Sequence, residues 1–380
     1  RILSIETQEA EGMPGVVKVV TGQGCKIHYG DNIRDLTPMA VDKVRYIGEP
    51  VAAVVAETVQ QARAAMEKIK VEYEPLPVYT DARQAMAEDA MLIHAENGSY
   101  WYLPTLHPVP GTNIANLYHL KKGRGEEGFD EAEVVIEGEF NYPLGSCSAL
   151  EPHGSIVWFK EDNTIDVWSS SICPTIVRDD LAHAYHLPIS DVRVRIPDIG
   201  GCFGYKSDIT VEQTIAYIAS FVPGYPVKWV ATRQEDYTST LIAHGIRVQM
   251  KIGARKDGKL VALKSTILHT GGAYADTAVN ITIAATHNST GPYVFEHCDS
   301  TGYTVYTNTP AVGAYRGYGH QESQIATERM MDMLARKLQI DPFELRRMNY
   351  LSEGKRNAVG EMMWKSNGDI AACAENTLRH

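Results

Sequence analysis

The sequence contains two glycine-rich segments whose residue types suit the binding of an anionic ligand. The first, residues 200–207 (GGCFGYKS), follows a predicted strand and precedes a predicted helix at residues 211–221. Glycines let a ligand approach the backbone closely, and successive N–H groups can form an anion-binding nest. A phosphate-binding P-loop is the nearest generic alternative, but Tyr205 stands where its second glycine is required. A glycine-rich turn without a ligand remains the alternative for this segment.

The second segment, residues 313–321 (GAYRGYGHQ), ends directly before a predicted helix that begins at Glu322. The free N–H groups at a helix N-terminus, reached through a glycine-rich approach, form a good anion site. The guanidinium of Arg316 could add a charge-assisted hydrogen bond. The alternative is a loop that only leads into the helix, with Arg316 held in a structural salt bridge.

Other motifs are weaker indications of a functional site. Residues 150–154 (LEPHG) are typical of a simple turn. His183 and His186 have the i, i+3 spacing of a metal-binding pair, but neither a third ligand nor an HExxH motif accompanies them. The sequence also has no GxSxG nucleophile elbow, and no GxGxxG follows a predicted strand. We therefore expect neither a serine hydrolase nor a dinucleotide-binding fold.

The composition is that of an ordinary globular protein, with 380 residues, 44% hydrophobic and 22% charged, which is long enough for two or three domains. A net charge of -11 argues against nucleic acid and anionic membranes as partners. No apolar run approaches the roughly 20 residues of a membrane helix, and no signal peptide opens the chain. The chain begins with Arg1, directly in a predicted strand, so we expect that some of its start is missing.

Six cysteines are scattered along the chain without a CxxC pair. Iron–sulfur clusters and structural zinc sites normally need such close pairs, so we expect neither in this chain. The scatter suits reduced cysteines in a cytoplasmic protein better than a disulfide framework.

Hydrophobic patterning divides the chain into three parts. Residues 1–85 predict a small α/β domain, and residues 86–125, with weak periodicity and several prolines, are typical of a linker. Residues 126–380 are rich in predicted strands. The predicted strands lie at residues 15–20, 49–56, 71–73, 134–140, 164–169 and 193–196, the first helix at residues 59–70, and a hairpin turn at Asp257-Gly258.

Two predicted helices follow the second glycine-rich segment. The first spans residues 322–338 and carries an apolar face. Its inward-facing residues are Ile325, Met330, Met333, Leu334 and Leu338. The second begins after Asp341, a fitting N-cap, with Pro342 at the first helical position and Glu344 placed to complete a capping box.

Taken in order, these segments resemble the molybdenum hydroxylases, the family of xanthine dehydrogenase, aldehyde oxidoreductase, nicotinate dehydrogenase and carbon monoxide dehydrogenase. Four stretches carry the resemblance, at residues 46–56, 200–206, 314–319 and 328–346. The resemblance implies an α+β fold, with an α/β hammerhead-like domain at residues 1–85 and a mixed α+β molybdopterin-binding domain at residues 126–380. It covers nearly the whole chain, and we expect the N-terminal half of a molybdopterin-binding subunit.

The resemblance also implies which residues bind the cofactor, molybdopterin either alone or as its cytosine dinucleotide. They are Gly201, Cys202, Phe203, Gly204, Ala314, Tyr315, Arg316 and Gly317. Phe203 and Gly204 would lie beside the metal, and the backbone around Arg316 would hydrogen-bond the pterin. Molybdenum itself would be held by the dithiolene of the pterin, so no protein side chain is expected as a metal ligand.

The substrate pocket implied by the resemblance is formed by Ile172, Ser207, Ala284 and Tyr318. In the purine-oxidising branch, a glutamine, a carboxylate and an arginine stand at the positions of Ile172, Ser207 and Ala284, respectively. Because a purine needs polar partners, these replacements favour an aldehyde or a similar electrophilic carbon, hydroxylated with water as the oxygen source. The alternatives are an N-heterocycle (nicotinate- or purine-like) hydroxylase, an aromatic thioester reductase of the same family, or a non-catalytic scaffold subunit.

No catalytic residue is identified in this chain. The family's general base, a glutamate, lies in the second half of the subunit, and Glu151 matches a framework position instead. We therefore expect an oxidoreductase that works only with a second molybdopterin half-subunit. Iron–sulfur clusters, and often FAD, would lie on further chains, and the remaining ligand is a small-molecule substrate. Neither nucleic acid nor membrane is expected as a partner.

Overall fold

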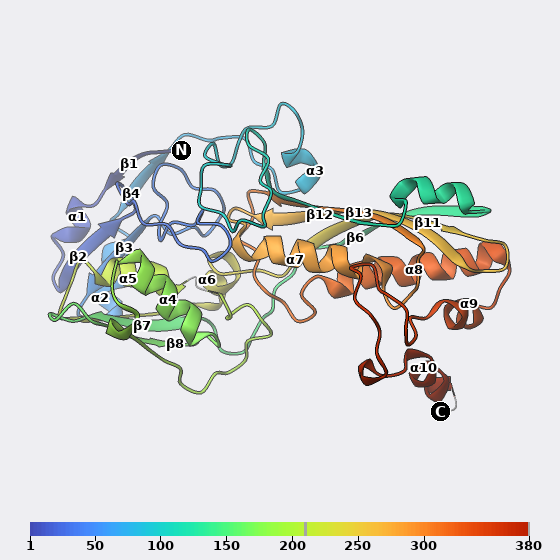
Figure 1. Cartoon of the computed structure of the whole chain (residues 1–380). Helices are drawn as coiled ribbons and strands as arrows, with labels where there is room; N and C mark the ends of the chain where they lie inside the picture. The colour runs from blue at the N-terminus through green and yellow to red at the C-terminus, as the bar shows by residue number, and fades with distance from the viewer. Residues whose placement is uncertain (209–210, 379–380) are drawn as a thin grey trace.

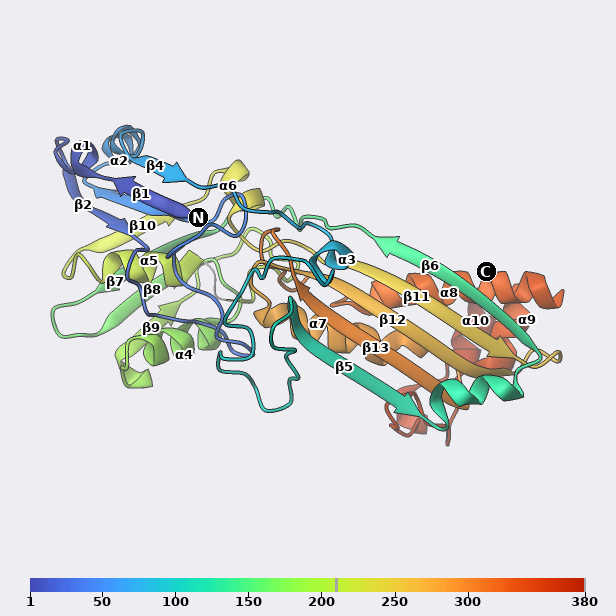
Figure 2. The ribbon, with the colours of Figure 1, turned by 90° about the horizontal axis from the view of Figure 1, so that it is seen from above.

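The computed structural model describes residues 1–208 and 211–378, which form two lobes (Figure 1). One lobe contains the N-terminal strands and a four-stranded sheet, and the other contains a five-stranded sheet with two long helices beneath it (Figure 2). The strands of both sheets run in mixed directions, and helices and strands follow one another along the chain without a regular alternation. The predicted α+β class is therefore confirmed.

The first 77 residues fold as two antiparallel strand pairs with helices against them. β1 (Ile2–Glu6) pairs with β4 (Lys70–Tyr73), and β2 (Val16–Thr21) pairs with β3 (Ala52–Ala56). Along the chain, α1 (Gln8–Glu11) lies between β1 and β2, and α2 (Val59–Met66) lies between β3 and β4. Thr58 caps α2, whose predicted extent to residue 70 is shortened because Lys70 already starts a strand.

The four-stranded sheet has the order β10-β7-β8-β9. Its strands are β7 (Gly154–Phe159), β8 (Ile165–Ser169), β9 (Val192–Arg195) and β10 (Pro226–Val230). Two helices, α4 (Pro174–Ala184) and α5 (Val211–Ala219), pack against it through fully buried side chains such as Val167 and Leu181. The first glycine-rich segment leaves this sheet after β9 and leads to α5.

The five-stranded sheet has the order β5-β13-β12-β11-β6. Its strands are β5 (Ile114–Lys122), β6 (Val134–Tyr142), β11 (Gly245–Ala254), β12 (Leu260–Gly272) and β13 (His297–Tyr306). β11 and β12 form the hairpin predicted at Asp257-Gly258. β5 lies within the segment expected to be a linker; as an edge strand with polar residues toward solvent, it lacks the pattern of a central strand.

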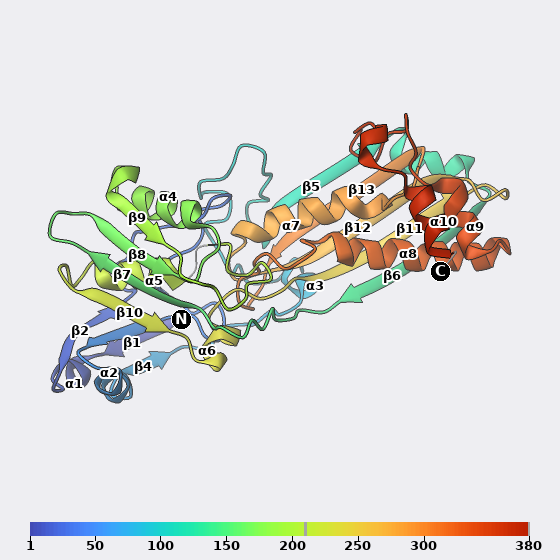
Figure 3. The same cartoon turned by 90° about the horizontal axis from the view of Figure 1, so that it is seen from below.

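The two faces of this sheet differ in character. α7 (Asp276–His287) and α8 (His320–Leu338) cover one face side by side (Figure 3), over a core that includes Ile246, Met250 and Met330. The opposite face carries alternating charged residues, such as Arg247 and its ion-pair partner Glu139 at 2.9 Å. The strands therefore follow the expected alternation of buried and exposed positions.

The predicted inward face of α8 is partly wrong. Ile325 is 46% exposed, whereas Ala326, Met330 and Leu334 are fully buried. Met330 and Leu334 are buried as predicted, and Met333 and Leu338 pack partly buried against the same core. Only Ile325 was assigned to the wrong face, and its neighbour Ala326 is buried instead.

The second predicted helix is α9 (Pro342–Asn349), and the side chain of Asp341 accepts hydrogen bonds from its first N–H groups as expected. Glu344 instead accepts from Arg347. The remaining elements are α3 (Ala82–Ala85), α6 (Arg233–Thr238), α10 (Ile370–Leu378) and the 3-10 turns η1 (Gly125–Glu131), η2 (Ile189–Asp191), η3 (Asn288–Thr290) and η4 (Lys365–Asn367).

The N-terminal part is tied to the second lobe at the start of α7. The carboxylate of Asp276 accepts the backbone N–H groups of Asn32 and Ile33 at 2.6 and 3.0 Å. Asp35 in turn accepts the N–H of Ala275 and the hydroxyl of Tyr306. These bonds fix α7 relative to the first lobe. Within the described residues, every helix is too short or too polar to cross a lipid bilayer.

Candidate functional site

The two glycine-rich segments, far apart in sequence, meet between the lobes. The backbone N–H of Arg316 donates to the carbonyl oxygen of Phe203 over 2.8 Å. The N–H of Ala314 lies 3.4 Å from the carboxylate of Asp208, which follows the first segment. The structure thus joins the two predicted ligand-binding segments, called below the first loop (residues 200–207) and the second loop (residues 313–319), into one surface.

The first loop needs glycine at two positions. Gly201 and Gly204 have φ angles of +116° and +117°, which L side chains rarely adopt. A Cβ on Gly204 would also stand 2.7 Å from the carbonyl oxygen of Ala314 in the second loop. Phe203 itself has a φ of +57°, and its ring is 50% exposed. Such strained positions occur mainly where the surroundings hold a loop in a functional shape.

The second loop has the same backbone character. Gly317, Tyr318 and Gly319 all have positive φ angles, and Gly319 is the N-cap of α8. Arg316 is exposed, and its guanidinium makes no ion pair with any residue in the described ranges. The structural salt bridge considered for Arg316 therefore has no partner there, and the side chain is accessible to a ligand.

Glu151 supports the first loop from behind. Its carboxylate accepts the N–H of Gly200 and the ammonium of Lys206, each at 2.9 Å. The ammonium also donates to the Glu151 carbonyl oxygen at 2.8 Å, and the Lys206 side chain has no exposed surface. The carboxylate is therefore occupied in holding the loop, which agrees with a framework position.

A second supporting network was not predicted from the sequence. The backbone N–H of His153 donates to Oδ1 of Asp236, and Nδ1 of His153 lies 2.8 Å from the same oxygen. The other carboxylate oxygen of Asp236 accepts the hydroxyl of Tyr205. Burial alone would raise the pKa of Asp236, but the two hydrogen bonds from His153 outweigh it, and the pKa is lowered. Arg233 completes the network. Asp236 lies within α6, and no local motif marks it.

The predicted pocket residues lie around these loops. The N–H of Ile172 donates to the carbonyl oxygen of Lys206, and its side chain is 46% exposed. The hydroxyl of Ser207 donates to the Gly204 carbonyl oxygen at 2.6 Å. Ala284 is half-buried on α7. Its neighbour Ala285 lies close to the second loop, because a Cβ built on Gly319 would stand 3.2 Å from the Ala285 side chain. The structure thus places Ile172 and Ser207 on the first loop's side, and Ala284 on the helix beneath the second loop.

Polar groups near Tyr318 were missed by the sequence analysis. Burial, with Asp276 nearby, raises the pKa of Asp208 to about 7. Burial and the charge of Asp208 likewise raise the pKa of Tyr318 to about 12, so its hydroxyl stays protonated. A carboxyl group therefore does stand near the predicted pocket residue Tyr318, one residue after Ser207, where the resemblance gives the purine branch a carboxylate.

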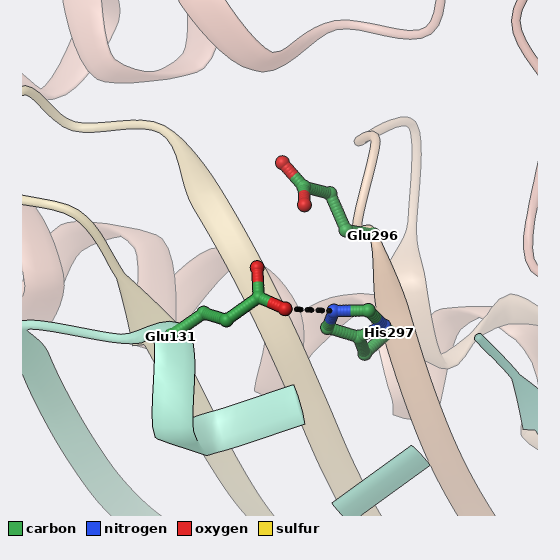
Figure 4. Close-up of side chains that lie close together, drawn as sticks. All are labelled: Glu131, Glu296 and His297. Atoms are coloured by element: carbon green, nitrogen blue, oxygen red, sulfur yellow. Dashed lines mark hydrogen bonds and ion pairs between the residues drawn. The ribbon is translucent and has the colours of Figure 1, made fainter. Parts of the chain in front are cut away.

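Among the described residues, one cluster has the composition of a metal site, namely Glu131, Glu296 and His297 (Figure 4). Nδ1 of His297 accepts the N–H of Arg124, so Nε2 carries the proton and faces Glu131 at 3.4 Å. The carboxylate of Glu131 also accepts from the guanidinium of Arg124 at 2.6 Å. A protonated nitrogen and a paired carboxylate make poor metal ligands, so this cluster is an ion-pair network.

Comparisons with known proteins identify both parts of the chain. Residues 106–350 match the family model of the molybdopterin cofactor-binding domain, and residues 1–77 match the a/b hammerhead domain of aldehyde oxidase and xanthine dehydrogenase. The chain belongs to this molybdopterin-binding family. The resemblance that the loop motifs carried is thereby confirmed.

Named relatives agree with this assignment. The chain is 31% identical over 371 residues to the xanthine dehydrogenase molybdenum-binding subunit of Escherichia coli O157:H7, covering 94% of this chain and 47% of that subunit. It is 30% identical to the nicotinate dehydrogenase large molybdopterin subunit of Eubacterium barkeri, covering 97% and 84%. The aldehyde oxidoreductase structure from Desulfovibrio gigas superposes with a TM-score of 0.87 at 29% identity, covering 100% and 41%.

The chain therefore spans about half the length of several relatives and most of the length of one. The loops fit the cofactor of this family on structural grounds. Left-handed glycines at 201, 204 and 317 leave backbone free of Cβ atoms, and Arg316 offers an accessible cation for an anionic pterin group.

Proposed function

We propose that the first and second loops bind molybdopterin in an oxidoreductase that hydroxylates an aldehyde or a similar electrophilic carbon, with water as the oxygen source. The observation that carries this proposal is the bond between Arg316 and Phe203, because it brings two glycine-rich loops of a molybdopterin-binding domain onto one surface. Bound molybdopterin would supply the molybdenum centre that accepts the electrons of the oxidation.

The role of this chain is to bind and orient. Backbone groups at residues 201–204 and 314–317 would hold the pterin, where glycine permits close contact. The guanidinium of Arg316 would pair with an anionic group of the cofactor. Glu151 and Lys206 would keep the first loop in shape from behind.

The substrate assignment is supported by the apolar side chain of Ile172, which is 46% exposed beside the first loop, and by Ser207, whose hydroxyl is already bonded to Gly204. Ile172 offers no polar group to a purine ring, and the hydroxyl hydrogen of Ser207 is already used in its bond to Gly204. The second candidate is an N-heterocycle, favoured by the protonated hydroxyl of Tyr318 and by a relative named nicotinate dehydrogenase.

We further propose that a second molybdopterin half-subunit provides the general base, and that chains with iron–sulfur clusters, and often FAD, accept the electrons. The division is supported by a relative of which this chain covers 84% and which is named a large molybdopterin subunit. Glu151 is committed to Lys206, so it is not free to act as the base. The free, scattered cysteines fit the expected cytoplasmic location.

The test is to purify the chain with its natural partners and to measure molybdenum, pterin and turnover of aldehydes, nicotinate and hypoxanthine. The proposal predicts stoichiometric molybdopterin and fastest turnover of an aldehyde. A complex without molybdopterin would support the non-catalytic scaffold instead.

A further inference from the structure

A buried histidine–glutamate pair lies directly beneath the second loop. His244 precedes β11, and Glu322 lies in the first turn of α8, immediately after the loop. Neither side chain has exposed surface, and Nδ1 of His244 lies 2.7 Å from Oε1 of Glu322. The pair thus joins the start of a central strand to the helix turn that ends the second loop.

His244 also contacts the second loop itself. Its ring packs edge-on against Tyr315, with 6.0 Å between the ring centroids. The carbonyl oxygen of Tyr315 accepts the N–H of Tyr318, and the next residue, Arg316, donates its N–H to Phe203. A continuous set of contacts therefore runs from the buried pair to the backbone groups that face the first loop.

Each residue is the closest polar partner of the other. His269, on β12, is the next ring, 6.2 Å from His244, and burial together with its closeness to His244 lowers its pKa to about 3, so it stays neutral. Nε2 of His244 and Oε2 of Glu322 have no hydrogen-bond partner among residues 1–208 and 211–378. Glu322 is thus the hydrogen-bond partner of His244, and its Oε1 also accepts the side-chain amide of Gln321 at 3.4 Å.

Stability alone does not account for such a pair. Removing two ionisable groups from water is costly, and apolar residues of similar volume are often as stable at such a position. The two unpartnered atoms add to the cost. What a short hydrogen bond provides, and an apolar contact does not, is a narrowly defined direction.

We propose that His244 and Glu322 are positioning residues for the second loop, an inference that rests on the proposed function. The pair fixes the first turn of α8 and the ring of Tyr315, and thereby directs the backbone of residues 314–317 toward the cofactor. Neither residue touches the cofactor. Their effect is on how firmly and in what geometry the loop holds it.

The test uses the complete enzyme with its partners and three variants. In Glu322→Gln, the amide oxygen can still accept the N–H of a neutral His244, so molybdopterin content and the Mo(V) electron paramagnetic resonance spectrum should match the wild type. The double variant His244→Leu/Glu322→Met leaves no unpaired buried charge, so it should fold. We expect its molybdopterin content to fall about tenfold, as for lost supporting contacts at metal sites, with an altered spectrum.

The matched control is Glu328→Ala, which removes a different carboxylate of α8, bonded to Arg346 and Tyr293 away from the loops. It should lower the melting temperature but leave cofactor content and spectrum unchanged. Normal molybdopterin content and an unaltered spectrum in the double variant would overturn the inference. A wild-type complex that holds no molybdopterin would instead overturn the proposed function, so the two failures are distinguishable.

Discussion

The backbone N–H of Arg316 donates to the carbonyl oxygen of Phe203 over 2.8 Å, and this bond joins the two loops into one surface. Gly204 fits beneath it only because it lacks a Cβ, which would meet Ala314 at 2.7 Å. The proposed cofactor-binding surface is therefore built from both lobes, and its shape depends on how the lobes are held together.

The chain should need a partner for catalysis. A general base must come within about 3 Å of the proton that it removes, directly or through one water, and Glu151 is held by Lys206 instead. Residues 1–380, supplied with molybdopterin and an artificial electron acceptor, should oxidise no substrate, whereas the complex with the second half-subunit should be active. Turnover by the isolated chain would refute this division of labour.

Glu151→Gln should change stability more than catalysis. The amide keeps an acceptor for Lys206 but loses the charge, so we expect a loss of about 1–3 kcal/mol in the free energy of unfolding. Turnover in the complete complex should stay within about threefold of the wild type, whereas loss of a general base typically costs about 10²–10⁴. A collapse of turnover with normal cofactor content would make Glu151 catalytic.

The substrate should be less polar than a purine. If Ile172 lines the pocket, the variant Ile172→Gln should raise the rate with hypoxanthine relative to an aldehyde, because it restores a polar partner for the ring. Steady-state kinetics of the two enzymes with both substrates measure the ratio. Faster oxidation of hypoxanthine than of any aldehyde by the wild type would show that the assignment from Ile172 and Ser207 is wrong.

Stability should fall as the pH rises through the range in which Asp35 ionises. Burial, with a contribution from nearby Asp276, raises the pKa of Asp35 from 3.8 to about 7. The folded state therefore holds this proton more tightly than the unfolded chain, and the resulting stabilisation is complete below about pH 4 and lost by about pH 7. Asp35→Asn cannot ionise, so it should avoid this loss.

Urea unfolding of both proteins at several pH values measures the effect. The free energy of unfolding of Asp35→Asn minus that of the wild type should grow between about pH 4 and pH 7, by at most about 4 kcal/mol. A difference that does not vary with pH would show that Asp35 keeps an ordinary pKa in the folded protein.

The parts of the site that sequence could predict are those with local signals. Glycine types and their spacing predicted both loops, and Asp257-Gly258 predicted the hairpin of β11 and β12. Each of these features depends on backbone conformations that few residue types allow. The strand and helix patterns of the first 77 residues were similarly local, and they match β2, β3 and β4, whereas the helix predicted to reach residue 70 ends at Met66.

What sequence could not predict depends on contacts between distant segments. Asp276 accepts N–H groups from residues 32 and 33, and His244 meets Glu322 across the core. Neither Asp276 nor His244 has a motif around it, and the motif before Glu322 does not indicate its partner. β5 lay hidden in the expected linker because an edge strand carries a weak pattern. Ile325 was assigned to the wrong face because apolarity, rather than small size, was taken as the sign of burial.

The most direct test of the central claim is the molybdopterin content of Gly204→Val in the complete complex. The added side chain would collide with Ala314 and force apart the two loops, so we expect a folded protein that retains almost no cofactor. Gly354→Ala is the matched control, because Gly354 also has a positive φ, of +79°, but nothing lies within 4 Å of its Cβ position. It should keep its cofactor. Wild-type molybdopterin content in Gly204→Val would contradict the assignment of the loops as the cofactor-binding site.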